Sequence, residues 1–287
     1  MRMRNFILEV YAIWISERPS QLAAALAYYG MFAFAPVIYI GFTIAGIFID
    51  QFVVAGQLYN QLQSILGQEA AVQVRDLVQA ISNTNSGGTF LVSLISFLAL
   101  YFAASGLFFQ IQYALNVIWR VPPPKRGHTQ AFIRKRLLSF VMVIGVGLLL
   151  VLMALVNLIL AWFGSLLSRL IGSGTIPLVL AWAASLGLIA LSFVLLYKLL
   201  PDVRIAWRDT LPGALVAALL VMIAGAIATL YFRSGSVGSA FEAAGAFAVL
   251  LLAIFYIAQI FLLGAVITRV YATLHGSRKP VQGAHSP

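Results

Sequence analysis

Six long stretches of the chain contain none of the four charged residue types and are rich in apolar side chains. A helix needs about twenty apolar residues to cross a hydrocarbon core of roughly 30 Å. Strands of a transmembrane β-barrel would instead show segments of about ten residues with alternating polarity. The pattern therefore predicts an all-α membrane protein with six transmembrane helices, over residues 22–49, 89–118, 138–165, 176–200, 211–232 and 243–270.

Residues 1–20 show a helical repeat outside the predicted spans. Phe6, Val10, Tyr11 and Trp14 recur at i, i+4, i+5 and i+8, a stripe typical of an amphipathic helix that lies in the membrane interface. Tyr11 and Trp14 are expected at the level of the lipid head groups. This helix either orients the first span or serves as a gating or partner-binding element.

Residues 50–88 form the longest segment between two predicted spans. Apolar residues repeat at helical spacing on both sides of Gly67, and residues 83–88 are polar and typical of a turn. We predict an extracytoplasmic helical insertion here, which either rests on the lipid surface or covers the mouth of a pocket. Residues 1–275 are then expected to form one membrane domain, followed by a disordered cytoplasmic tail at residues 276–287.

The composition agrees with a membrane protein. Hydrophobic residues make up 62% of the 287 residues and charged residues 9%, whereas soluble domains carry about 25% charged residues. A water-soluble globule is excluded, because its surface would lack charge. The chain has no cysteine, which excludes disulfides, thiolate nucleophiles and cysteine-bound metals.

The net charge of +10 would favour nucleic-acid binding in a soluble protein, but its distribution indicates topology instead. Arg75, Arg169 and Arg233 lie on one side of the predicted helices, and the other 15 of the 18 Lys and Arg residues lie on the opposite side. The positive-inside rule predicts a multi-pass protein of the bacterial plasma membrane with both termini in the cytoplasm.

The partners follow from the same distribution. No nucleic-acid partner is expected. The basic loop at residues 120–136 either enforces the topology or binds anionic lipid head groups or a soluble anion. The sequence leaves a homo-oligomer open.

The ionisable residues show no pattern typical of an active site. The eight acids are scattered, the three histidines lie in predicted loops or the tail, and no nucleotide-binding, hydrolase or zinc motif is present. We therefore predict no catalytic residue, no metal, no cofactor and no enzymatic activity. Asp202 and Asp209 share a short loop with two arginines, and they either balance charge at the membrane surface or bind two metals in a hydrolase.

Polar residues and a proline within the spans are candidates for lining a substrate site. Pro36 lies inside the first span and predicts a kink there, which would free a backbone carbonyl. Gln112 and Asn116 share one helical face and predict a polar seam that Gln259 extends, unless these amides only hold helices together.

Arg204 and Arg208 stand at i and i+4 in the loop between the fourth and fifth spans. Two guanidinium groups with this spacing can clamp a phosphate, or the pair only follows the positive-inside bias. The complete set of candidate lining residues is Tyr28, Pro36, Gln112, Asn116, Arg204, Arg208 and Gln259.

Small residues four positions apart predict close contact between helices. Two such pairs lie in the last two spans, namely Gly213 with Ala217 and Gly264 with Thr268. We interpret them as packing surfaces and not as ligand sites.

Five segments stand in a distinctive order: LAYYGMFAFAP at 26–36, ALNVIWRVP at 114–122, RKRLLSF at 134–140, PDVRIAWRDTLPGALVAALL at 201–220 and AAGAFAVLLLAIFYIAQIFLLGAVITRVYA at 243–272. Together they resemble the YihY/BrkB family of bacterial inner-membrane proteins, formerly labelled ribonuclease BN-like. The resemblance covers most of the chain and implies a six-helix inner-membrane protein for which transport or lipid handling is suspected.

The chain departs from the family pattern in the last span. Members usually carry an acid where this chain has Val266, and often Tyr-Gly where it has Phe241 and Glu242. A proton-coupled mechanism through the usual carboxylate is therefore in doubt, unless Glu242 replaces it.

Three functions fit these observations. The leading hypothesis is a transporter or flippase for a small, amphiphilic or anionic substrate, with a cavity among the first, second, fifth and sixth spans. The alternative is a membrane scaffold or regulator that recruits a partner through the basic loop. A membrane-associated ribonuclease is the third hypothesis.

Overall fold

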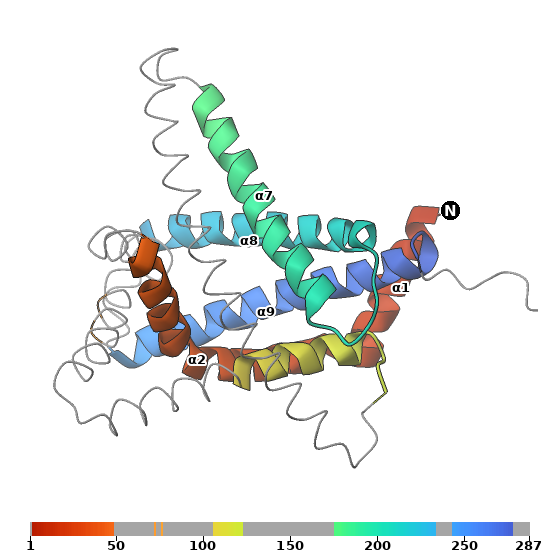
Figure 1. Cartoon of the computed structure of the whole chain (residues 1–287), viewed down its shortest axis with the longest axis horizontal. Coiled ribbons are helices and arrows are strands. Elements are labelled where there is room, and N and C mark those ends of the chain that lie inside the picture. The colour runs from red at the N-terminus through yellow and green to blue at the C-terminus, as the bar shows by residue number, and fades with distance from the viewer. Residues whose placement is uncertain are drawn as a thin grey trace, which may run out of the picture.

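The computed structural model describes residues 2–48, 72, 76, 106–122, 175–233 and 243–277 (Figure 1). All regular structure in these ranges is helical, as the sequence predicted. The longer helices are α1 (Arg2–Glu17), α2 (Pro19–Phe48), α7 (Thr175–Leu199), α8 (Trp207–Arg233) and α9 (Ala243–Leu274), and a shorter apolar helix covers Gly106–Ile118.

Three helices in this part of the chain are long and apolar enough to cross a membrane. They cover Trp182–Leu199, Trp207–Ala228 and Ala248–Leu274. The predicted span at 138–165 and the insertion at 50–88 lie outside the described residues, apart from Val72 and Asp76.

α8 begins four residues earlier than the predicted span at 211–232. Pro212 is the sixth residue of α8 and lies inside the helix, so it leaves the carbonyl oxygen of Arg208 without its usual N–H partner. Asp209 lies in the first turn of α8, where a carboxylate interacts favourably with the helix dipole.

α2 runs as one helix through Pro36 and changes direction along its length (Figure 1). A bend is the expected consequence of a proline inside a helix, since the ring lacks an N–H and crowds the preceding turn. The side chain of Pro36 itself lies outside the described part of the structure.

α9 is the central helix of the described bundle. It lies between α8 and α2 and also contacts α1, while α7 packs mainly on α8 (Figure 1). The core cluster draws on all of these helices and on the helix Gly106–Ile118, with Leu115, Tyr197 and Leu262 among its fully buried members. Val266, the apolar replacement for the expected acid, is also fully buried in this cluster.

The contact between α8 and α9 confirms that the small residues form a packing surface. A β-carbon built on Gly264 would lie 2.8 Å from Cβ of Ala217 and 2.8 Å from the carbonyl oxygen of Gly213. The two predicted pairs therefore face each other, and the two backbones approach closely. Tyr197 of α7 completes the junction, because its hydroxyl donates a 2.6 Å hydrogen bond to the carbonyl oxygen of Phe261.

α1 is a helix as predicted, but most of its aromatic and apolar stripe does not face the lipid interface. Phe6, Val10 and Trp14 pack against the core cluster, in which Ile13 is buried. These side chains pack on protein and not on lipid, because α9 offers them an apolar surface. Tyr11 points outward and is 62% exposed, so it keeps the exposed position that the sequence predicted.

Candidate functional site

One end of the bundle carries most of the described polar contacts between elements, and we call it the polar end. Four segments meet there (Figure 1): the α1–α2 junction, the C-terminus of the helix Gly106–Ile118, the loop between α7 and α8, and the C-terminus of α9. Every chain segment named here belongs to the side that the sequence predicts to be cytoplasmic.

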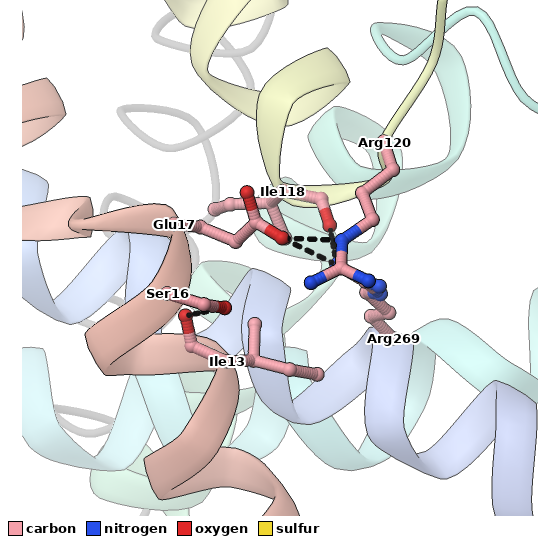
Figure 2. Close-up of polar contacts among 6 residues, drawn as sticks. All are labelled: Ile13, Ser16, Glu17, Ile118, Arg120 and Arg269. Atoms are coloured by element: carbon pink, nitrogen blue, oxygen red, sulfur yellow. Dashed lines mark hydrogen bonds and ion pairs between the residues drawn. The ribbon is translucent and has the colours of Figure 1, made fainter.

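Glu17 at the end of α1 joins two arginines from distant parts of the chain (Figure 2). Its Oε1 accepts a 2.5 Å hydrogen bond from Nε of Arg120 and lies 3.6 Å from Nη1 of Arg269. The side chains of Glu17 and Arg269 are each 14% exposed, whereas that of Arg120 is 62% exposed. The ion pair is therefore shielded from water on one side and open on the other.

Arg269 also stabilises the end of a helix. Its Nη1 donates a hydrogen bond to the carbonyl oxygen of Ile118, one of the last carbonyls of the helix Gly106–Ile118 (Figure 2). Such carbonyls have no partner within their own helix, and a cation near them is favourable. One guanidinium group thus ties α9 to this helix and, through Glu17, to α1.

The chain leaves the same helix through a left-handed turn at Arg120, which has φ of 51°. The N–H of Val121 donates to the carbonyl oxygen of Asn116, and the N–H of Arg120 donates to that of Val117, both at 2.9 Å. This pair of hydrogen bonds defines a Schellman motif, in which glycine usually occupies the left-handed position. The turn aims the Arg120 side chain at Glu17.

Asp202 in the α7–α8 loop binds the two amides of the predicted polar seam. Nδ2 of Asn116 donates to Oδ2 at 2.9 Å, and Nε2 of Gln112 donates to Oδ1 at 3.2 Å. The N–H of Asp202 donates in return to Oδ1 of Asn116 at 2.9 Å. Because Gln112 is buried and Asp202 is exposed, these contacts form a polar boundary between the core and the surface.

Asp209 links the first turn of α8 to the segment after α9. The N–H and the hydroxyl of Ser277 donate to Oδ2 of Asp209 at 2.9 and 2.6 Å. Gly276 lies so close that a β-carbon there would be 2.3 Å from Oδ1. Asp202 thus binds Gln112 and Asn116, whereas Asp209 binds Ser277. In the described part of the chain no three His, Cys, Asp or Glu side chains gather to hold a metal ion.

The structure brings together two of the seven predicted lining residues, Gln112 and Asn116, through Asp202. Tyr28 lies elsewhere on α2, where it is 59% exposed and makes edge contacts with the rings of Tyr29 and Phe32. Gln259 is half-buried on α9. It forms no hydrogen bond within the described residues, so the predicted extension of the seam to Gln259 is not found there.

Arg204 and Arg208 do not share a helical face. Arg204 lies in the non-helical loop and Arg208 in the first turn of α8, and both are exposed. Their spacing of four residues therefore does not by itself put the two guanidinium groups on one side, and the phosphate clamp stays a prediction. In the described part of the molecule neither arginine forms an ion pair.

Sequence reasoning missed Glu17, Arg120 and Arg269 as a group. Arg120 and Arg269 were interpreted only as topology signals, and Glu17 only as one of the scattered acids. A useful signal was available: an acid on the basic side of a membrane protein has many arginines within reach and seldom stays unpaired. The identity of its partners, 103 residues away for Arg120, required the fold.

Comparisons with known proteins identify a family of membrane proteins. A family model described as virulence factor BrkB matches residues 12–286. The chain is 26% identical over 203 residues to a UPF0761 membrane protein of Rhodospirillum centenum, an alignment that covers 70% of this chain and 42% of that protein. The chain therefore spans less than half the length of this curated relative. No solved structure matches the chain.

Proposed function

Since the chain belongs to the virulence factor BrkB family of membrane proteins, we propose that it is a six-span protein of the bacterial plasma membrane that moves an amphiphilic or anionic substrate across the bilayer. In this proposal both termini and the polar end face the cytoplasm. The protein acts as a transporter or lipid flippase and not as an enzyme.

The observation that supports this role most directly is the Glu17 ion pair, which joins α1, the helix Gly106–Ile118 and α9. A transporter has to close one side of its pathway while the other side opens. Polar contacts that are open to water on one side suit such a closure, because water replaces the partner when the contact opens. We assign the polar end as the cytoplasmic closure of the pathway.

The Asn116–Asp202 contacts support the same assignment. They join the helix Gly106–Ile118 to the α7–α8 loop. Asn116 is four residues before Arg120, which forms the ion pair with Glu17 at the end of the same helix. Two separate connections at one end hold the same helix from two directions. A substrate path that reaches the cytoplasm between these elements has to release at least one of them.

Flux measurements with purified protein in liposomes test the proposal. The substrates are a fluorescent anionic phospholipid, a zwitterionic phospholipid and a panel of small organic anions. Glu17→Gln weakens the closure by roughly 1 kcal/mol, so we expect a change in rate of about fivefold. Arg4→Gln is the matched control, because Arg4 is an exposed arginine of α1 that forms no ion pair in the described structure.

Wild-type protein that moves none of these substrates contradicts the proposal. Equal rates for the wild type, Glu17→Gln and Arg4→Gln would agree with a transport function. They would contradict the assignment of the polar end as the cytoplasmic closure.

A further inference from the structure

Two residues of the described chain other than glycine have a positive φ angle, and both are arginines. Arg18 has φ of 47° and Arg120 has φ of 51°. A residue with a β-carbon in this left-handed region is destabilised by about 1–2 kcal/mol, a penalty that glycine avoids. The two arginines also share a neighbour, because Arg18 follows Glu17 and Arg120 binds it.

The backbone conformation does not favour arginine at either position. Arg120 occupies the glycine position of a Schellman motif, and only its Nε is used by Glu17. Arg18 precedes a proline, which favours an extended backbone and not a left-handed one. Arg18 is exposed, and its side chain forms no hydrogen bond or ion pair with the described residues. Strained backbone at both positions therefore points to a role for the side chains.

The charges around Glu17 leave a positive surplus. Arg18, Arg120 and Arg269 carry three positive charges. The nearby carboxylates are Glu17 and Glu9, which lies about two helical turns earlier on α1. Three positive and two negative charges leave a net charge of +1. The side chain of Arg120 is 62% exposed, and its hydrogen bond to Glu17 uses Nε, so no described residue accepts a hydrogen bond from its terminal nitrogens. A guanidinium group with free terminal nitrogens is well suited to bind a phosphate with two parallel hydrogen bonds.

The outer face of α1 indicates that the phosphate belongs to a lipid. Ile7, Leu8, Tyr11 and Ile15 lie on this face, and each is between 55% and 62% exposed. An apolar helix face next to arginines is typical of a helix at the boundary between acyl chains and head groups. It would hold Arg18, at the end of α1, at the level of the lipid phosphates.

We propose that Arg18 and Arg120 bind the phosphate of an anionic phospholipid in the cytoplasmic leaflet. Glu17 holds Arg120 in position and leaves its terminal nitrogens free for the phosphate. The site rests on the orientation given under the proposed function, but lipid binding here does not require that the protein transports anything.

Lipid binding to the purified full-length protein tests this site. Native mass spectrometry in detergent measures the affinity for phosphatidylglycerol and for phosphatidylcholine. We expect a preference for phosphatidylglycerol in the wild type and a loss of affinity of about tenfold or more in Arg18→Gln/Arg120→Gln. Arg4→Gln is the control variant and should bind as the wild type does.

Arg120→Gly separates the ligand role from a folding role. Glycine relieves the left-handed backbone, so thermal unfolding of this variant should occur at or near the wild-type temperature, while its affinity for phosphatidylglycerol falls by about fivefold. Circular dichroism measures the unfolding temperature on the same preparation that is used for lipid binding. Unchanged lipid affinity in Arg120→Gly or in the double variant would overturn the site.

Competition with soluble anions identifies the source of the phosphate. Inorganic phosphate and glycerol phosphate at millimolar concentration should leave bound phosphatidylglycerol in place. Displacement by either anion, or equal binding of phosphatidylcholine, would overturn a lipid site. Flux measured in parallel separates the two proposals, since lipid binding that persists without any transport refutes only the proposed function.

Discussion

Gly213 has no room for a side chain at the contact between α8 and α9. A β-carbon built there would lie 2.1 Å from the carbonyl oxygen of Gly264 and 2.1 Å from the hydroxyl of Thr268. We predict that Gly213→Ala lowers the free energy of unfolding by about 1–3 kcal/mol, because overpacking outweighs the gain in helix propensity. Thermal unfolding in detergent measures the change.

Gly187 in α7 provides the matched control for this prediction. A β-carbon there would meet none of the described atoms within 4 Å, so Gly187→Ala should be neutral or stabilise α7 by about 0.5–1 kcal/mol. A Gly213→Ala variant as stable as Gly187→Ala would show that the two backbones are further apart than the structure has them.

The reciprocal bonds between Asn116 and Asp202 predict a specific rescue. Asn116→Asp removes the Nδ2 donor and sets two carboxylates against each other, which should destabilise the protein by about 1–3 kcal/mol. Adding Asp202→Asn restores an amide opposite a carboxylate, and we expect it to recover part of the loss. Unfolding temperatures of the two single variants and the double variant form a cycle, and strictly additive effects would contradict a direct contact.

The sequence revealed which polar residues share a helical face but not what they bind. The spacing of Gln112 and Asn116 predicted their common seam, since residues four apart are neighbours on a helix. Their partner, Asp202, is 86 residues from Asn116 and depends on how the α7–α8 loop folds back. The same reasoning does not apply to Arg204 and Arg208, because Arg204 lies in a loop and spacing has this meaning only inside a helix.

At the scale of elements, α1 has two apolar faces with different surroundings. Ile13 is 8% exposed and packs in the core cluster, whereas Ile15 is 57% exposed on the outer face. We predict that Ile13→Ala lowers the unfolding free energy in detergent by about 2–4 kcal/mol, because it leaves a cavity against the bundle. Ile15→Ala, the same change on the opposite face, should cost less than about 1 kcal/mol.

Equal effects of these two variants would contradict the docking of α1 on the bundle. They would instead return the helix to the position that the sequence first predicted, with its aromatic stripe in the lipid interface.

The sequence predicted where helices begin and end better than it predicted which helix faces pack on protein. The limits of α2 and α7 agree with the predicted spans at 22–49 and 176–200 to within a few residues, because the absence of charge over such lengths has few explanations besides a bilayer. The face of α1 could not be predicted in the same way. Its apolar residues suit both lipid and protein, and only the position of α9 decides between them.

For the whole molecule, the structure adds a second reason to place the described polar segments on one membrane face. The positive-inside bias was read from the sequence alone, whereas the contacts of Glu17, Asp202 and Asp209 join the corresponding segments physically. Ion pairs and amide contacts between segments on opposite faces would have to pass through the hydrocarbon core. These contacts are the ones that the predicted topology requires, because they join segments that it places on one face.

Cysteine labelling tests this arrangement in cells, and the wild-type chain is a suitable background because it has no cysteine. We predict that Arg4→Cys, Arg204→Cys and Ser277→Cys react with a membrane-impermeant maleimide only after spheroplasts are permeabilised, since moving the basic segments across the membrane is unfavourable. Ser86→Cys, in the predicted extracytoplasmic insertion, should react in intact spheroplasts. Labelling of Arg204→Cys and Ser277→Cys from opposite faces would be incompatible with the contact between Asp209 and Ser277. This result would also contradict the membrane orientation on which both proposals rest.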